Sequence, residues 1–161
     1  MPTAYIETTI PSYYVASASS SLFQVSKLAA TRKWWDGGCS GLDLVTSLIT
    51  LDEAGKGDAR LADERLRLLE PIHLLHLSDE ALELARLLLE LGIVPAKAAP
   101  DSLHIAVASF HRIDYLVTWN FKHIANPFLR DRLRNAEERA GFELPVMCSP
   151  EELLQNDEDD R

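Results

Sequence analysis

The 161 residues suffice for one domain with its own hydrophobic core, and an apolar fraction of 47% is ordinary for a folded protein. The formal net charge of −9 argues at first against a nucleic-acid partner. The two cysteines match no metal or disulfide pattern, and no apolar run approaches the ~20 residues that span a bilayer, so we expect a cytoplasmic protein without membrane segments.

Strands and helices are predicted to alternate along the whole sequence. Uncharged or alternating apolar runs predict strands, and apolar side chains spaced by 3.6 residues between capping residues predict helices. In chain order we predict a strand over residues 4–8, a helix over 22–35, a strand over 42–47, helices over 48–54 and 58–69, a strand over 72–77, helices over 79–91 and 102–108, a strand over 115–118, a helix over 127–140, a strand over 145–148 and a last helix beginning at 149–152. This order predicts an α/β fold of three layers, α/β/α, with a central, mostly parallel sheet flanked by helices.

The negative charge is concentrated at the C-terminal end. From Glu151 onward six acids and one base sum to −5, so that −9 minus −5 leaves −4 for residues 1–150. We therefore divide the chain into a single domain, 1–150, and a segment, 151–161, with the start of a short helix and a disordered acidic tail. Acids gathered around a divalent cation would make the net charge a still poorer guide to RNA binding.

The stretch over residues 98–123 contains the most informative polar residues. Asp101 lies in the first turn of a predicted helix, where an acid is also explained by the unpaired N–H groups and the helix dipole. The uncharged strand over 115–118 is predicted to be central and to end in Thr118 and Asn120. Open parallel sheets bind their ligands at the carboxyl ends of strands, so this edge is our candidate site.

Three acids from distant parts of the chain are each predicted near that edge, with Asn120 beside them: Glu7, Glu53 and Asp101. Carboxylates separated by roughly 4 Å repel by a few kcal/mol, so a cluster of them requires a cation. Mg²⁺ and Mn²⁺ prefer oxygen ligands, activate a bound water and stabilise charge on a phosphate. Glu7 also has a structural interpretation, as a solvent-facing residue at a strand end. The sequence contains no dinucleotide, NTP or serine-hydrolase motif.

The sequence resembles PIN-domain proteins, the family of the VapC-type toxins, from Tyr5 to about Ile124. The resemblance rests on four stretches: Tyr5-Ile6-Glu7-Thr8-Thr9, Ser47 with Glu53 six residues later, Pro100-Asp101-Ser102-Leu103-His104-Ile105-Ala106, and Leu116-Val117-Thr118-Trp119-Asn120-Phe121-Lys122-His123-Ile124. It implies a PIN-like fold and a Mg²⁺- or Mn²⁺-dependent endoribonuclease, the toxin of a type II toxin–antitoxin system, which hydrolyses RNA phosphodiester bonds with a metal-activated water. It also implies a homodimer and a cognate antitoxin that occludes the site.

The resemblance assigns catalytic roles to four residues. Glu7, Glu53 and Asp101 correspond to the acids that hold the metal, and Asn120 is expected to orient the attacking water. Glu7 stands where the family commonly has Asp, and Asn120 stands where many members have a fourth acid, so one charge is absent. Asp52, the neighbour of Glu53, is an alternative second acid.

Further residues are expected to support the site or to contact RNA. Thr118 matches a supporting hydroxyl of the family, Ser47 belongs to the second motif, and His104 is expected to pack or to support a ligand rather than to bind the metal. The basic residues expected at RNA phosphates are Lys97, Lys122, Arg130 and Arg134. For the basic helix over 127–140, a solvated surface helix is the favoured interpretation and phosphate contact is the alternative. The competing function is a catalytically weak or inactive PIN-like module that binds RNA or a protein partner.

Overall fold

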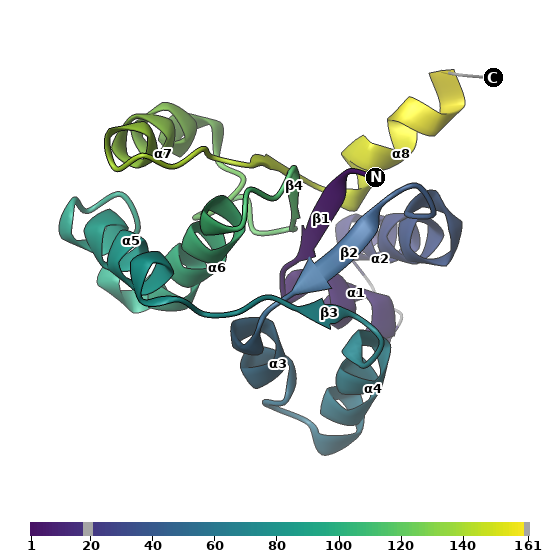
Figure 1. Cartoon of the computed structure of the whole chain (residues 1–161). Helices are drawn as coiled ribbons and strands as arrows, with labels where there is room; N and C mark the ends of the chain where they lie inside the picture. Colours follow the sequence, from purple (N-terminus) through teal and green to yellow (C-terminus); the bar gives the residue numbers. More distant parts are fainter. Residues whose placement is uncertain (18–20, 160–161) are drawn as a thin grey trace.

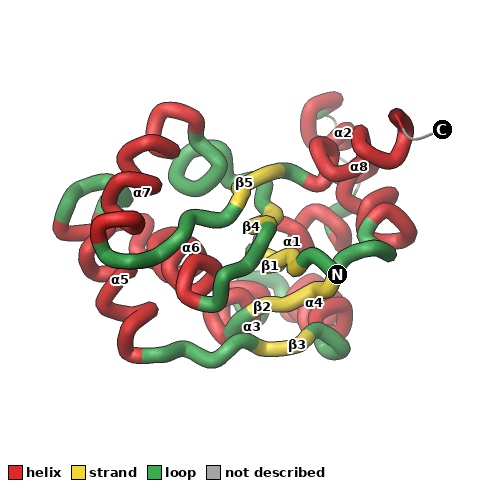
Figure 2. Tube along the Cα trace, turned by 45° about the horizontal axis from the view of Figure 1, so that its top comes forward, coloured by secondary structure: helices red, strands yellow, loops and turns green. Residues whose placement is uncertain are grey.

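A computed structural model of the protein describes residues 1–17 and 21–159, with side chains as far as Leu154. One five-stranded sheet consists of β1 (Thr3–Ile6), β2 (Asp43–Thr46), β3 (His73–Leu74), β4 (Tyr115–Val117) and β5 (Val146–Cys148). The strand order is β3-β2-β1-β4-β5 and all neighbouring strands are parallel (Figures 1 and 2). The prediction of a mostly parallel central sheet is confirmed, and among the described residues the sheet is entirely parallel.

Helices cover both faces of this sheet. The α-helices of the described ranges are α1 (Thr9–Val15), α2 (Leu22–Lys33), α3 (Leu48–Ala54), α4 (Ala59–Leu69), α5 (Asp79–Glu90), α6 (Ala99–Phe110), α7 (Pro127–Arg139) and α8 (Pro150–Asp159). A π-helical turn, η1 (Trp34–Gly38), continues α2, and a 3₁₀ turn, η2 (Ala96–Ala98), precedes α6. Figure 1 shows α5, α6 and α7 on one side of the sheet and α1, α2, α4 and α8 on the other, which confirms the predicted three layers.

The central strand β1 packs against both helical layers. Tyr5 belongs to the core shared with α5, α6 and α7, whereas Ala4 and Ile6 belong to the core shared with α1, α2 and α4. All three side chains are fully buried. Successive side chains of a strand point to opposite faces, so a strand covered on both sides needs apolar residues at every position. An acid can therefore follow β1 only where the strand leaves the core.

The order of the strands reverses at β1. The chain continues from β1 to β2 and β3 on one side, and then crosses to β4 and β5 on the other. The helices of this crossing, α5 and α6, lie on the face of the sheet opposite to α1, α2 and α4, as right-handed crossovers require. In open α/β sheets, ligands bind outside the carboxyl ends of the strands at such a switch point. Here Glu7 follows β1 and Thr118 follows β4, so both residues flank it.

Several elements differ from their predicted bounds, most of them by one to three residues at an end. The strand predicted over 72–77 is only His73–Leu74, because its sole neighbour β2 ends at Thr46 and offers no further pairing partner. The helix predicted over 22–35 ends as an α-helix at Lys33 and continues into η1. There the side chains of buried Trp34 and of Leu154 pack against Gly38. A Cβ atom on Gly38 would lie only 2.7 Å from the Leu154 side chain.

The C-terminal segment also differs from the prediction. Where we predicted a short helix start and a disordered tail, α8 continues from Pro150 to Asp159. Residues 160–161, the last part of the predicted tail, lie outside the described residues. Across the described ranges, no helix combines the length and apolar character needed to cross a bilayer.

Candidate functional site

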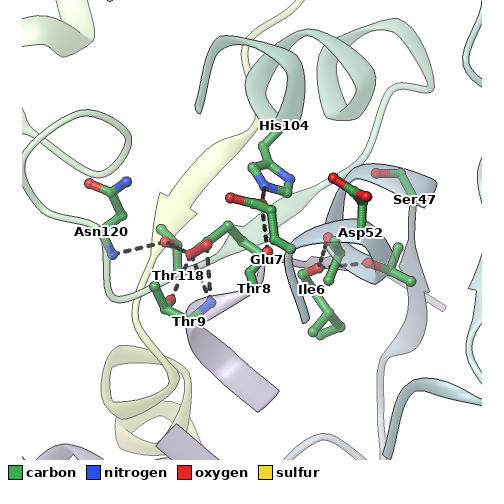
Figure 3. A network of polar contacts seen from close by, with 12 residues as sticks. Ile6, Glu7, Thr8, Thr9, Ser47, Asp52, His104, Thr118 and Asn120 are labelled. Carbon is green, nitrogen blue, oxygen red and sulfur yellow. Dashed lines mark hydrogen bonds and ion pairs between the residues drawn. The ribbon is translucent and has the colours of Figure 1, made fainter. Parts of the chain in front are cut away.

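The candidate site lies where β1, β2 and β4 end and α1, α3 and α6 begin. Figure 3 shows the polar side chains that converge there, with Glu7 at the end of β1, Thr118 at the end of β4 and His104 reaching in from α6. Glu53 comes from the last turn of α3 and Asp101 from the first turn of α6. The sheet thus brings together residues from four separate parts of the sequence.

Glu7 is held by hydroxyl groups although it is only 3% exposed. Its Oε1 accepts hydrogen bonds from Thr9 Oγ1 and Thr118 Oγ1, each at 2.6 Å, and its Oε2 accepts one from the Thr9 N–H at 3.0 Å (Figure 3). Burial raises the pKa of Glu7, while the charge of His104 and these hydrogen bonds lower it. The donors therefore orient the carboxylate and offset part of the cost of burying its charge.

The same two hydroxyl groups tie the loop after β4 to the end of β1. Thr9 Oγ1 accepts a hydrogen bond from the Trp119 N–H at 2.8 Å, and Thr118 Oγ1 accepts one from the Asn120 N–H at 2.9 Å. Each hydroxyl group accepts a hydrogen bond from a backbone N–H group and donates one to the Glu7 carboxylate. The loop geometry and the orientation of the carboxylate are thus set by the same contacts.

His104 is fully buried and joins Glu53 to the core of the sheet. Its Nε2 lies 2.5 Å from Glu53 Oε1, and its Nδ1 lies 2.7 Å from the Tyr5 hydroxyl oxygen, which in turn contacts Ser47 Oγ at 2.7 Å. Burial lowers the pKa of His104, but Tyr5, Glu53 and Glu7 raise it to about 10. At neutral pH the imidazolium therefore donates from both ring nitrogens. This position between a carboxylate and a phenol is that of a supporting residue.

Glu53 rather than Asp52 belongs to this cluster. Besides His104, Glu53 Oε1 accepts a hydrogen bond from Thr8 Oγ1 at 2.7 Å. Burial raises the pKa of Glu53, but the hydrogen bond and charge of His104 outweigh it, and the net pKa is lowered. Asp52 points to solvent, where it pairs with Lys56 at 3.1 Å. The i,i+4 pair with Lys56 gives Asp52 a surface role.

Asp101 is half-buried and is held by Asn120. Burial raises the pKa of Asp101, whereas the hydrogen bond from Asn120 and the charges of His104 and His123 lower it. Asn120 Oδ1 accepts a hydrogen bond from the His123 N–H at 3.0 Å, so its amide group faces Asp101. In this arrangement Asn120 positions Asp101, a role that the sequence analysis did not assign to it.

The three carboxylates share His104 as their positive neighbour. The charge of His104 acts on Glu7, Glu53 and Asp101 alike. Across residues 1–17 and 21–159, however, no group of three or more His, Cys, Asp or Glu side chains lies close enough together to hold a metal ion as it stands. The acids form one electrostatic cluster, which the buried imidazolium holds together.

The donor atoms of this cluster suit Mg²⁺ or Mn²⁺, because both ions prefer oxygen ligands. Among the described residues, both hydrogen bonds that Glu53 accepts fall on Oε1, which leaves Oε2 for a ligand. Asp101 and Glu53 are partly exposed, whereas Glu7 is fixed. The residues therefore fit such an ion by the chemistry of their donors, and binding requires the carboxylates to move closer together.

A groove of about 560 Å³ leads from solvent to Glu53. It is lined by Thr8, Leu48, Ile49, Asp52, Glu53, Lys56, Leu77, Pro100 and Leu103. Most of its lining residues belong to α3 and the start of α6, the two elements that carry Glu53 and Asp101. The groove gives a ligand access to one side of the acid cluster.

The basic residues expected at RNA phosphates fall into two groups. Lys97 lies in η2, shortly before Asp101, and Lys122 is the second residue after Asn120; both are exposed. Arg130 and Arg134 lie one turn apart on α7, and Arg134 pairs with Asp131 at 3.2 Å. Of these four basic residues, the two lysines are the ones that lie close to site residues in the chain.

Sequence reasoning missed Tyr5, Thr8 and Thr9 as parts of the site. Thr8 donates to Glu53, Thr9 donates to Glu7, and Tyr5 contacts His104. Two consecutive hydroxyl residues directly after an acid at a strand end were the available signal, because hydroxyls are the short donors that a buried carboxylate needs. Tyr5 gave no signal, since an aromatic residue in a strand is ordinary.

The comparisons with known proteins leave the family open. None of the protein-family models matches this sequence, and neither does any curated protein. The likeness to PIN-domain proteins therefore rests on the four motifs in the sequence and stays a prediction.

Proposed function

We propose that this protein is a Mg²⁺- or Mn²⁺-dependent ribonuclease of the PIN-domain type, which cuts single-stranded RNA or the loop of a structured RNA. One observation carries the proposal: Glu7, Glu53 and Asp101 come from three separate parts of the chain and meet at the switch point of the sheet, where buried His104 contacts Glu53 and its charge acts on all three. Acids do not gather without a functional or structural reason, because their mutual repulsion destabilises the fold.

The three carboxylates are the residues that would hold the metal ion. A bound Mg²⁺ or Mn²⁺ supplies a Lewis acid that stabilises charge on a phosphate and lowers the pKa of water. Thr9 and Thr118 keep Glu7 in a fixed orientation. His104 keeps Glu53 in place with its Nε2 proton, and the amide of Asn120 keeps Asp101 in place. These contacts reduce the reorganisation that binding requires.

The same resemblance suggests partners for the protein. RNA as substrate, a small cognate antitoxin and a homodimer are all predictions from the motifs. Of the four basic residues predicted at RNA phosphates, Lys97 and Lys122 are the best placed to meet phosphates beside the acids, because both lie within four residues of a site residue in the chain.

The test is RNA cleavage in the presence of Mn²⁺ or Mg²⁺. We expect Asp101→Asn to reduce the rate at least about a hundredfold, because it removes one charge from the cluster. Asp52→Asn is the matched control: it removes the exposed neighbour of Glu53, which pairs with Lys56, and should leave the rate unchanged. Equal cleavage by the wild type and Asp101→Asn would show that the assignment is wrong.

A second function is favoured by a specific observation. In the described residues the charge of His104 already neutralises part of the acid cluster, and Asn120 brings no charge where the resemblance expects a fourth acid. These features suit a non-cutting module that binds RNA or a protein partner. Calorimetry with Mn²⁺ separates the two functions: the ribonuclease binds the ion and loses binding on Asp101→Asn, whereas the non-cutting module shows no binding in either form.

A further inference from the structure

Four aromatic rings gather around the ammonium group of Lys27 beside the acid cluster. The Nζ atom lies 4.4 Å from the centroid of Phe23, 5.6 Å from Tyr13, 5.5 Å from Trp119 and 5.6 Å from Phe121. We call these five residues the aromatic platform. A cation within about 6 Å of a ring face is attracted by the negative face of the ring, so Lys27 is held in place by the rings around it.

Hydrogen bonds keep the centre of the platform rigid. The indole Nε1 of Trp119 donates to Thr31 Oγ1 at 2.8 Å, and Thr31 Oγ1 donates to the Lys27 carbonyl oxygen at 2.7 Å. Trp119 and Thr31 are buried, so these contacts are shielded from water. The ring centroid of Trp119 lies 6.0 Å from that of Tyr13 and 5.8 Å from that of Phe121. The platform is thus ordered before any ligand arrives.

The outer rings of the platform face solvent. Phe23 is 68% exposed and Phe121 is 42% exposed. In the described part of the chain no carboxylate forms an ion pair with Lys27, so its charge remains available to an anion. Exposed aromatic rings next to an unpaired cation are the combination that binds single-stranded nucleic acids, because bases stack on the rings and the cation meets the phosphates.

The platform adjoins the acid cluster directly. Trp119 lies between Thr118 and Asn120 in the chain, and its backbone N–H donates to Thr9 Oγ1. The same Thr9 hydroxyl donates to Glu7. One hydroxyl group therefore separates the backbone of the platform from the most buried carboxylate of the site. A strand of RNA with a phosphate near Glu7 would pass over the platform with a neighbouring nucleotide.

We propose that the aromatic platform stacks an unpaired base of the RNA on Phe23 and Phe121, while Lys27 contacts an adjacent phosphate. This proposal rests on the proposed function, and it specifies the substrate class as RNA that is single-stranded beside the cleaved bond. A paired base is already stacked within its duplex and offers no free face to the rings. Stacking tolerates any base, so the platform selects strandedness and not sequence.

The test measures binding without cleavage. Fluorescence anisotropy of a labelled short oligouridylate is recorded in EDTA, so that no divalent ion supports cutting. We expect Phe121→Ala and Phe23→Ala each to weaken binding about fivefold or more, and a duplex of the same length to bind more weakly than the single strand. Lys27→Gln should lower the slope of log affinity against log salt by about one.

Phe128→Ala is the matched control, because Phe128 is 91% exposed but lies on α7 outside the platform. It should bind the oligonucleotide like the wild type. Any of three results would overturn the proposed role of the platform. These are equal RNA affinities of all variants, a loss of affinity on Phe128→Ala as large as on Phe121→Ala or Phe23→Ala, and no RNA binding by the wild type. Circular dichroism checks that the variants are folded.

The binding test and the cleavage test can give independent results, so the platform and the ribonuclease can be contradicted separately. Binding that depends on Phe121 and Phe23, in a protein that does not cut RNA with Mn²⁺, supports the platform and contradicts the ribonuclease. Cleavage by a wild type whose RNA binding does not depend on these rings supports the ribonuclease and contradicts the platform.

Discussion

Glu7 and Glu137 are both buried glutamates, one at the carboxyl edge of the sheet and the other on α7. Glu7 is 3% exposed and Glu137 is fully buried. Burial raises the pKa of both carboxyl groups, and that of Glu137 reaches about 7. Their surroundings differ, however. The hydrogen-bond partners of Glu7 stabilise its charged form, whereas the surroundings of Glu137 favour the protonated acid.

Glu7 has donors for a charged carboxylate, whereas Glu137 has the contacts of a protonated one. Thr9, Thr118 and the charge of His104 all stabilise the anion of Glu7. Glu137 contacts only the Ser109 hydroxyl, at 2.7 Å from Oε2, and its Oε1 has no partner among the described residues.

The Ser109 hydroxyl can also serve a protonated Glu137. Its Oγ lies 2.9 Å from the Ile105 carbonyl oxygen, besides the contact with Glu137. A hydroxyl has one proton, which Ser109 can donate to Ile105 while it accepts a hydrogen bond from protonated Glu137. We therefore infer a structural role for Glu137 and a functional role for Glu7.

Glu7→Gln should have the largest effect. The substitution removes the charge but keeps the size of the side chain, so we expect RNA cleavage with Mn²⁺ to fall about a thousandfold. Glu137→Gln in the same assay should cut at the wild-type rate. Similar losses in both variants would mean that the two glutamates do not differ as proposed.

His104→Gln tests what holds the acid cluster together. Glutamine is neutral, so Glu53 and Glu7 lose their shared cation, and breaking a buried pair of this kind costs about 3 kcal/mol or more. Urea unfolding at neutral pH measures the change. A free energy of unfolding equal to that of the wild type would contradict a stabilising role for the imidazolium.

Glu137→Gln should raise the stability at pH 8 by up to about 3 kcal/mol, the equivalent of a pKa raised from 4.5 to about 7. The folded protein binds the Glu137 proton more tightly than the unfolded chain. Its contribution is therefore complete below pH 4.5, falls as the pH rises through about 7, and is lost above that. Urea unfolding of both proteins at pH 4 and pH 8 checks this.

The stability of the variant relative to the wild type is the informative quantity, because other groups titrate over the same range. The contribution of Glu53 to the stability has the opposite pH dependence. Its pKa is lowered in the folded protein, so this contribution is lost as the pH falls. A constant difference between Glu137→Gln and the wild type at the two pH values would contradict the neutral glutamate.

Ser109→Ala should have the smallest effect. It removes the hydrogen-bond partner of Glu137 and costs about 1 kcal/mol of stability at acidic pH, the usual net value of such a bond. Thermal unfolding at a pH below 6 measures it. An unchanged melting temperature would mean that the hydroxyl does not hold the protonated acid.

Much of the fold follows from local signals in the sequence. Ser78 and Asp58 directly precede α5 and α4, and their side chains accept hydrogen bonds from the Ala81 and Leu61 N–H groups. These caps depend on residues three positions apart, so the sequence shows them directly. Ser47 stands at the same position before α3, but its hydroxyl contacts Tyr5 instead, because the neighbouring strand brings that phenol within reach.

The alternation of strands and helices, and the placement of acids after strands or at helix ends, could be predicted from local patterns, because periodicity and capping act over a few residues. Which acids meet depends instead on the tertiary fold. His104 reaches Glu53 across 51 positions and Thr118 reaches Glu7 across 111. The tertiary fold also turned Glu53 inward and Asp52 outward, and it buried Glu137 with a single side-chain contact, from the Ser109 hydroxyl to Oε2. Contacts between residues so far apart depend on the order of the strands, which no local pattern encodes.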